Sequence, residues 1–345
     1  MPKMMRAAIF SEFGGPDVIE IREVPIPEPG PGEVRIQVGA AAMNHLDLWV
    51  RRGLPIQTTM PHIGGSDLAG EVDAVGPGAD SVPLGTRVVV DPSLGYQWYE
   101  GQGRGKSFHE SPFRLIGEHT QGGFAEYAVV PSDNLLEVPD GVSFVDAAAA
   151  GLVFTTAWRA LVTRAQVQAG ERVLITGASG GVGTAAIQVA ERAGARVYAV
   201  TSGPEKVHLA RQLGAHVVYD RQKVDFSREV WRDTRKEGVH VVFDTVGEMV
   251  WQQCLMALAP CGRLVTSGAT TGSRGVTEIR RVFWKQLSIM GSTMGTPAEF
   301  RRVMRLVFGG SLQPMIHQVM PLEDAGLAHQ ILEDGKVFGK VVLEP

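Results

Sequence analysis

Short runs of β-branched residues recur through the first third of the chain, and turn-forming residues separate them. The clearest runs lie at 34–38, 71–75 and 87–90, and segments such as PEPGPGE and GPGAD lie between the runs. Gly and Pro interrupt regular structure, so each run is long enough only for a short strand. The pattern predicts a β-rich N-terminal domain.

From Ser143 onward the pattern changes to one typical of alternating helices and strands. Residues 144–161 are Ala-rich with helical character, and strand-like apolar runs separated by amphipathic stretches follow at 172–176, 196–200, 216–219, 240–244 and 263–267. Strands that alternate with helices form parallel sheets. We therefore predict an α/β fold with a Rossmann-type doubly wound parallel sheet.

After Gly291 the pattern predicts that the chain leaves this alternating region. A helical pattern at 297–307 precedes a turn and a closing strand at 339–343. We expect three segments: a β-rich domain at 1–152, a dinucleotide-binding domain at 153–291, and a segment at 292–345 that returns to complete the first domain.

Composition and charge indicate which classes of binding partner the protein has. The 345 residues are 44% hydrophobic and 20% charged, with a formal net charge of −4, so nucleic acid is not expected as a partner. The two cysteines, Cys254 and Cys261, do not suggest a disulfide framework. The N-terminus lacks an apolar signal core, and no apolar run approaches the ~18 residues of a membrane span. We expect a cytoplasmic protein, without a membrane partner, that binds a small-molecule substrate.

A glycine-rich segment follows the first predicted strand of the alternating region. Its residues are Gly177, Ser179, Gly180, Gly181, Val182 and Gly183. Glycines allow close backbone approach to a pyrophosphate, and a helix N-terminus offers unpaired N–H groups. The strand, loop and helix context favours a dinucleotide site over the alternative of a tight turn without a ligand.

The end of the second strand of this region indicates which dinucleotide binds. NAD-selective proteins usually place an acidic residue there, but this chain has Thr201 and Ser202, with Lys206 and Arg221 expected nearby. Two cations and no carboxylate favour a 2′-phosphate, and therefore NADP(H) over NAD(H). The alternative is that both cations are ordinary solvated side chains.

The chain resembles the medium-chain dehydrogenase/reductase superfamily over essentially its whole length. The resemblance is carried by NHLDLWVRRG, HIGGSDLAGEVDAVG, GEHTQGGFAEY, GASGGVG and GKVFGKVVL. It implies a GroES-like catalytic domain formed by both chain ends, an inserted Rossmann domain, and a cleft that holds nicotinamide. It also implies a homodimer or homotetramer, in which the strand at 288–291 pairs with its copy.

The zinc ligands of the alcohol dehydrogenases in this superfamily are replaced here. At those positions the chain has Asn44, Ser66 beside Asp67, and Leu152. An amide and a hydroxyl are poor zinc ligands, and an alkyl group is none. We expect no catalytic zinc, although a rearranged site using His45 and His62 with Asp47 or Asp67 is an alternative.

The structural zinc lobe of those enzymes is replaced as well. Its four cysteine positions fall on Tyr96, Tyr99, Gln102 and Glu110. Without thiolates the lobe cannot hold a structural zinc, so we expect it to be mobile or held by packing of its aromatic residues.

Without a metal, the substrate must stabilise its own negative charge. Quinones and α,β-unsaturated carbonyls delocalise the charge that hydride addition produces. The chain resembles the zinc-free quinone oxidoreductases, close to zeta-crystallin, whose Asn-x-x-Asp-x-x-x-Arg pattern is present as Asn44, Asp47 and Arg51. In this hypothesis Asn44 donates to the oxyanion, Asp47 orients Arg51 or a ribose hydroxyl, and water supplies the proton. The alternative is a helical Asp47–Arg51 ion pair worth ~0.3–0.5 kcal/mol, with Asn44 capping that helix.

Further cofactor contacts follow from the resemblance. The loops expected near the cofactor contribute Thr156, Thr245, Val246, Gly268, Ala269 and Thr270, and the closing segment contributes Lys340. A solvated lysine is the alternative for Lys340.

Two other functions fit the sequence. One is an alcohol dehydrogenase that recruits zinc through other ligands. The other is a non-catalytic, crystallin-like protein that binds NADPH. Metal content separates the first from the main hypothesis, and inertness toward every quinone and enone favours the second.

Overall fold

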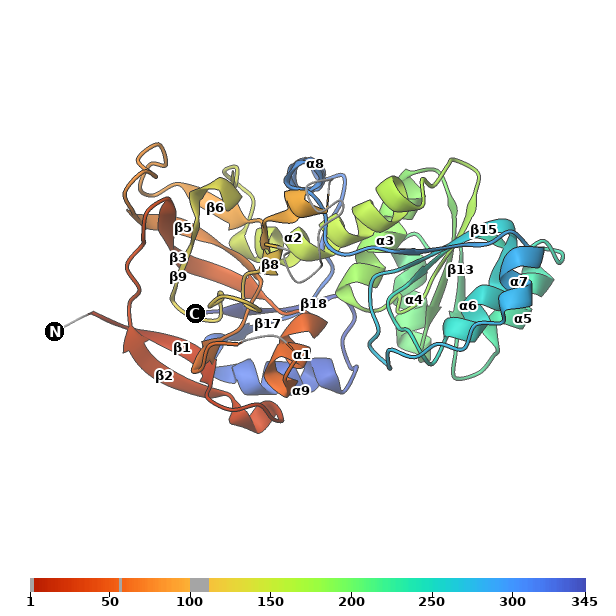
Figure 1. Ribbon diagram of the computed structural model, residues 1–345, viewed down its shortest axis with the longest axis horizontal. Helices are drawn as coiled ribbons and strands as arrows, with labels where there is room; N and C mark the ends of the chain where they lie inside the picture. The colour runs from red at the N-terminus through yellow and green to blue at the C-terminus, as the bar shows by residue number, and fades with distance from the viewer. Residues whose placement is uncertain (1–2, 56–57, 100–111) are drawn as a thin grey trace. The chain divides into compact units, whose positions relative to one another are not determined.

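The computed structural model describes residues 3–55, 58–99 and 112–345 (Figure 1). The chain forms two compact units. Unit 1 contains residues 1–152 and 295–345, and unit 2 contains residues 153–294. The sequence places the second boundary at 291/292, three residues before the observed one at 294/295.

Unit 1 is built mainly on antiparallel strands, and β17 and β18 pair parallel. A seven-stranded sheet has the order β10-β6-β5-β3-β18-β17, with β9 also paired to β3, and a three-stranded sheet has the order β2-β1-β4. The pair β7-β8 stands apart. The strands are β1 (Met4–Phe10), β2 (Glu20–Pro25), β3 (Glu33–Ala42), β4 (His62–Ile63), β5 (Asp67–Val75), β6 (Arg87–Val90), β7 (Ser93–Leu94), β8 (Arg114–Leu115), β9 (Tyr127–Pro131), β10 (Leu135–Glu137), β17 (Ile316–Pro321) and β18 (Lys340–Glu344).

Alternation along β3 explains how these strands bury one face. Val34 and Ile36 are fully buried and Val38 is 6% exposed, as a period of two requires. The closing strand β18 pairs antiparallel with β3, with Val342 opposite Ala42. Through this pairing the C-terminal strand joins the same sheet as the N-terminal strands.

Short helices complete unit 1. They are η1 (Pro16–Val18), α1 (His45–Arg52), η2 (Tyr96–Trp98), η4 (Ser132–Asn134), α8 (Pro297–Phe308), η6 (Leu322–Asp324) and α9 (Ala325–Glu333). Thr296 caps α8: its hydroxyl accepts from the Glu299 N–H at 3.1 Å, and the Glu299 carboxylate accepts from the Thr296 N–H at 2.8 Å. The predicted helix at 297–307 thus extends one residue further.

The aromatic residues near η2 pack on one another. Tyr96 and Tyr99 contact each other at 5.4 Å between ring centroids, and Phe113 lies 5.5 Å from Tyr96 and 5.1 Å from Tyr99. Aromatic packing was one of the two states expected for this lobe. Gln102 and Glu110, the other two replaced cysteine positions, lie outside the described residues.

Unit 2 contains a six-stranded parallel sheet in the order β13-β12-β11-β14-β15-β16. Its strands are β11 (Arg172–Ile175), β12 (Arg196–Thr201), β13 (Val217–Asp220), β14 (Val239–Asp244), β15 (Leu258–Thr266) and β16 (Ser288–Gly291). Its helices are α3 (Gly181–Arg192), α4 (Pro204–Gln212), α5 (Phe226–Asp233), α6 (Trp251–Ala257) and α7 (Ile279–Trp284). The Rossmann-type prediction is confirmed. The strand order reverses beside β11, and ligands of such sheets bind outside the carboxyl ends of the strands at this point.

The Ala-rich segment at 144–164 is a core helix. It comprises α2 (Phe144–Trp158) and the π-helical turn η5 (Arg159–Arg164). By length and composition it is the one described helix able to cross a membrane, but 72% of its apolar window is buried inside the protein. Its apolar character therefore reflects packing.

Candidate active site and nucleotide loop

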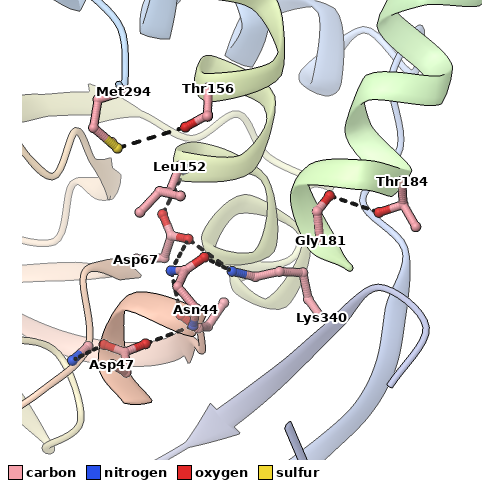
Figure 2. Close-up of polar contacts among 11 residues, drawn as sticks. Asn44, Asp47, Asp67, Leu152, Thr156, Gly181, Thr184, Met294 and Lys340 are labelled. Atoms are coloured by element: carbon pink, nitrogen blue, oxygen red, sulfur yellow. Dashed lines mark hydrogen bonds and ion pairs between the residues drawn. The ribbon is translucent and has the colours of Figure 1, made fainter. Parts of the chain in front are cut away.

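A buried polar cluster lies at one end of the unit 1 sheet (Figure 2). Asn44, Asp67 and Lys340 are 7%, 1% and 3% exposed. The Lys340 ammonium donates to Asn44 Oδ1 at 2.6 Å and to Asp67 Oδ2 at 3.2 Å. Asn44 Nδ2 donates to the same Asp67 oxygen at 2.9 Å. The three side chains form a closed set of contacts, which we call the buried triad.

Strand register explains why these three residues meet. Asn44 follows the end of β3, Asp67 begins β5 and Lys340 begins β18. β3 lies between the other two strands, and its residue Ala42 pairs with both Asp67 and Val342. Both neighbours run antiparallel to β3, so their first residues lie beside its last.

The buried triad includes Asn44, one of the positions tied to zinc by the resemblance, and Asp67, which follows a second such position, Ser66. Asp67 Oδ1 accepts from the Leu152 backbone N–H at 2.8 Å, and the Asn44 oxygen already accepts from the ammonium. Among the described residues no group of three or more His, Cys, Asp or Glu side chains could hold a metal ion. An amide, a hydroxyl and an alkyl group beside a cation do not fit a zinc ion.

The two histidines of the alternative zinc site, His45 and His62, do not form a zinc site with the neighbouring carboxylates in the described residues. His62 Nε2 contacts the Gly117 carbonyl at 3.0 Å, and the side chain is 1% exposed. Burial lowers the pKa of His45 to about 4, with the Lys340 charge as a further cause. The positive charge of Lys340 therefore already acts on His45, and it would repel a zinc ion bound there.

The Asp47 carboxylate accepts hydrogen bonds from backbone N–H groups near Asn44. It accepts from the Asn44 N–H at 2.7 Å and from the Gly65 N–H at 3.1 Å. Burial raises the pKa of Asp47 to about 6, while these amides act in the opposite direction. Asp47 thus fixes the start of α1, where Asn44 is the N-cap residue.

Arg51 has a different partner from the one expected. It is fully buried, donates to the Gly14 carbonyl at 3.1 Å and pairs with Glu333 of α9 at 2.6 Å. The helical Asp47–Arg51 ion pair is therefore not the pairing that the structure shows, because the Asp47 carboxylate is turned to backbone amides. Glu333 was missed by sequence reasoning, since it lies 282 residues away.

Glu118 is a second carboxylate that the sequence did not single out. It is 9% exposed, and burial raises its pKa from 4.5 to about 7, with the Asp47 charge as a further cause. His119 Nδ1 lies 3.7 Å from its Oε2. A carboxylate with so few partners destabilises the folded state when it ionises.

Glu118→Gln is therefore expected to stabilise the protein at alkaline pH. A pKa raised in the folded state gives stability that is present below pH 4.5 and is lost as pH rises to about 7. The variant should gain about 2 to 3 kcal/mol at pH 8 and little at pH 4.5. Thermal unfolding across this range measures the effect, with exposed Glu137→Gln as the control. An equal shift at all pH values would contradict it.

In unit 2 the glycine loop joins β11 to α3. Gly177 has φ +58°, and a Cβ there would lie 2.7 Å from Thr245 Oγ1. A Cβ on Gly183 would lie 2.2 Å from the Gly177 carbonyl oxygen. At Gly180, the N-cap of α3, the nearest atom to an added Cβ is 3.6 Å away, and no side chain caps the helix. The first-turn amides of Gly181, Val182 and Gly183 have no acceptors within the helix, so this loop fits a dinucleotide phosphate.

Neighbouring loops meet the glycine loop at the carboxyl end of the sheet. Asp244, fully buried at the end of β14, accepts from Thr176 Oγ1 at 2.5 Å and from the Val246 and Gly247 N–H groups at 3.1 and 3.0 Å. Thr270 Oγ1 donates to the Thr245 carbonyl at 2.9 Å. The structure thus brings together the predicted residues Gly177, Thr245, Val246, Gly268, Ala269 and Thr270.

The predicted 2′-phosphate residues also lie near one another. Thr201 ends β12, and the Arg221 N–H donates to its carbonyl at 3.0 Å. Burial lowers the pKa of Lys206, and the Arg221 charge lowers it further. Asp220 was not anticipated; its Oδ1 accepts from the Gly203 and Gln222 N–H groups at 3.2 and 3.1 Å.

The remaining predicted residues have local roles in the structure. Ser179 and Ser202 are half-buried within their loops. Thr156 lies on α2, 5% exposed, and its hydroxyl contacts Met294 Sδ at 3.8 Å (Figure 2).

Comparisons with known proteins agree with this architecture. Residues 30–140 match the alcohol dehydrogenase GroES-like domain family, and residues 181–309 match the zinc-binding dehydrogenase family. The human quinone oxidoreductase is 31% identical over 352 residues, which cover 99% of this chain and 98% of that protein. The crotonyl-CoA reductase of Streptomyces avermitilis is 32% identical over 371 residues, covering 95% of this chain and 82% of that protein.

Solved structures extend the comparison. An NAD-dependent alcohol dehydrogenase has a TM-score of 0.92 and 41% identity, with 99% and 100% of the two chains covered. A cobalt- and zinc-bound thermostable alcohol dehydrogenase from Pyrobaculum aerophilum has a TM-score of 0.88 and 35% identity, covering 99% and 100%. A crotonyl-CoA carboxylase/reductase, AntE, in complex with NADP has a TM-score of 0.90 and 28% identity, covering 100% and 95%.

The chain therefore belongs to the medium-chain dehydrogenase/reductase superfamily, in its part similar to zinc-type alcohol dehydrogenases. It is an oxidoreductase of that superfamily.

Proposed function

We propose that this protein is a zinc-independent, NADP(H)-dependent oxidoreductase that reduces a quinone or an α,β-unsaturated carbonyl compound. The observation that carries the proposal is the buried triad, in which the Lys340 ammonium contacts Asn44 and Asp67 beside residues that do not fit zinc. The similarity to a quinone oxidoreductase and to crotonyl-CoA reductases supports the acceptor class.

When bound, a nicotinamide dinucleotide supplies a hydride to the acceptor. The first-turn amides of α3 bind its phosphates, because the helix N-terminus carries a partial positive charge. Gly180 leaves room for their close approach. The Asp244 carboxylate holds the neighbouring loop in place through Thr176 and two backbone amides.

The reaction balances without a metal. NADPH, a quinone and one proton give NADP⁺ and a hydroquinone; an enone gives the saturated carbonyl compound. Hydride addition leaves the negative charge on the acceptor oxygen, and water supplies the proton. Hydrogen-bond donors can stabilise such a delocalised anion.

Preference for NADP(H) is expected to depend on Lys206 and Arg221. Lys206→Ala/Arg221→Ala should raise the Kd of NADPH about 10- to 100-fold, because two charge-assisted bonds to the 2′-phosphate are lost. The Kd of NADH should change less than about twofold. Fluorescence titration measures both, with Arg228→Ala, an exposed cation of α5, as the control. An equal loss for both cofactors would contradict the assignment.

The oligomer is proposed from the edge of the unit 2 sheet. β16 is the last strand in the sheet order, and Ile289 on it is 40% exposed. Phe283 and Trp284 of α7 are 62% and 83% exposed. An edge strand beside exposed apolar side chains suits pairing with a second copy.

Light scattering of the wild-type protein should show a dimer or tetramer. Ile289→Lys should reduce the mass of the oligomer, because it places a charge on the edge strand. A monomeric wild-type protein would contradict this.

An alcohol dehydrogenase activity is the second candidate, favoured by the 41% identity to an NAD-dependent alcohol dehydrogenase. Oxidation of NADPH and NADH against quinones, enones and aldehydes, together with alcohol oxidation, distinguishes the two. We expect reduction of quinones or enones with NADPH. Efficient alcohol oxidation with neither of these activities would support the second candidate.

A further inference from the structure

Lys340 is an ammonium buried with one hydrogen-bond donor left over. An ammonium has three N–H donors, and the contacts with Asn44 Oδ1 and Asp67 Oδ2 use two of them. Within residues 3–55, 58–99 and 112–345 no third acceptor is found for this nitrogen. A buried donor without an acceptor is costly, so such a group suits a ligand oxygen.

The surroundings of Lys340 hold the charge in one place. Asp67 is anchored by the Leu152 N–H on one oxygen and by the Asn44 amide on the other. Asn44 is anchored in turn through its backbone N–H, which donates to Asp47. Buried ion pairs rarely add to stability compared with apolar residues of similar size. A buried charge this well oriented is typical of a functional group.

We propose that Lys340 stabilises the negative charge that develops on the acceptor oxygen during hydride transfer. This inference rests on the proposed function, and it adds the residue that provides the electrophilic group. Lys340 contacts Asn44, which occupies a zinc-ligand position by resemblance. Its charge thus lies beside the place where the zinc-containing relatives polarise the substrate oxygen.

The step uses the leftover donor and keeps the ammonium intact. Hydride adds to the carbon conjugated with the carbonyl group, the π electrons move to oxygen, and the third Nζ–H donates to that oxygen. Water then delivers one proton to the anion, so Lys340 begins and ends the cycle with three protons. Asp67 and Asn44 are positioning residues that keep the nitrogen in place.

A variant that removes both charges tests the role without leaving a buried carboxylate unpaired. Lys340→Met alone leaves the Asp67 carboxylate buried without its cation. The double variant Asp67→Asn/Lys340→Met instead leaves two neutral side chains. The new amide oxygen can still accept from the Leu152 N–H. The matched control is Arg35→Met/Asp73→Asn, which removes another ion pair of the same sheet, with Arg35 Nε 2.9 Å from Asp73 Oδ1.

The measurements are kcat at saturating NADPH and acceptor, the Kd of NADPH, and the unfolding temperature. Using an acceptor that the wild-type enzyme reduces, we expect kcat to fall about 100- to 1000-fold in Asp67→Asn/Lys340→Met. The Kd of NADPH should stay within about twofold, and the protein should remain folded. The control variant should keep the wild-type kcat.

Three results would overturn the inference. An unchanged kcat in the folded double variant removes Lys340 from the reaction. A raised Kd of NADPH with unchanged kcat assigns the donor to the cofactor instead. A wild-type enzyme inert toward every quinone and enone removes the proposed function, and this inference with it; the first two results leave the proposed function standing.

Discussion

Asn44→Ala is expected to lower kcat for acceptor reduction about 100- to 1000-fold while the Kd of NADPH changes less than about twofold. The Asn44 amide accepts from the Lys340 ammonium at 2.6 Å and donates to Asp67 at 2.9 Å. Alanine removes both contacts and frees the ammonium to move. Helix α1 should persist, because Asp47 bonds the backbone N–H of residue 44, which alanine keeps.

A control separates this effect from simple loss of a helix cap. Asp225 is the N-cap of α5, and its carboxylate accepts from the Ser227 N–H at 3.0 Å. Asp225→Ala should cost about 1 kcal/mol of stability and leave kcat unchanged. Steady-state kinetics and thermal unfolding of both variants make the comparison. Unaltered turnover in Asn44→Ala would remove Asn44 from the mechanism.

Gly180→Ala is expected to raise the Kd of NADPH about 10- to 100-fold while the fold is retained. Within the protein an added Cβ meets nothing closer than the Gly177 carbonyl oxygen at 3.6 Å, so alanine fits sterically. The backbone at Gly180 is extended, with φ −77°, which alanine adopts freely. The methyl group would instead occupy the space through which a pyrophosphate approaches the α3 amides.

Gly326→Ala in α9 is the matched control, because its Cβ would lie 3.4 Å from the Pro16 carbonyl oxygen, an ordinary contact. It should leave the Kd of NADPH unchanged. Fluorescence titration and unfolding temperatures are measured for both variants. A Gly180→Ala protein that is folded and binds NADPH as tightly as the wild type would mean that the phosphates lie elsewhere.

Periodicity predicted the fold because each element has a local cause. The runs at 196–200 and 240–244 lie within β12 and β14, where buried apolar side chains on both faces produce continuous hydrophobic segments. The helix predicted at 297–307 also has local causes in the structure, with Pro297 at its first position and Glu299 in its capping box. The domain boundary shifted by three residues because no local signal separates β16 from the segment that follows.

The contacts within the site were less predictable because they join distant residues. Lys340 and Asp67 are 273 positions apart, and Arg51 and Glu333 are 282 apart. Helical spacing suggested an Asp47–Arg51 pair, but the backbone amides of Asn44 and Gly65 bind the Asp47 carboxylate. Sequence patterns indicate which residues lie at an element's end, and only the sheet register shows which of these ends meet.

Asp220 shows the same limit in unit 2. The sequence placed Thr201, Ser202, Lys206 and Arg221 at the ribose side without an acid, yet Asp220 ends the adjacent strand β13 and accepts from the Gly203 N–H. Parallel pairing of β12 with β13 puts Asp220 opposite Thr201. Two backbone amides bind one oxygen of this carboxylate, which reduces its repulsion of a phosphate.

The most direct test of hydride transfer without zinc combines metal analysis with activity. The purified enzyme is analysed for zinc, and NADPH-dependent reduction of quinones and enones is measured before and after treatment with a chelator. We predict activity that the chelator does not change, with no zinc bound at the Asn44, Ser66 and Leu152 positions. About one zinc per chain, with activity lost on chelation and restored by zinc, would contradict the account.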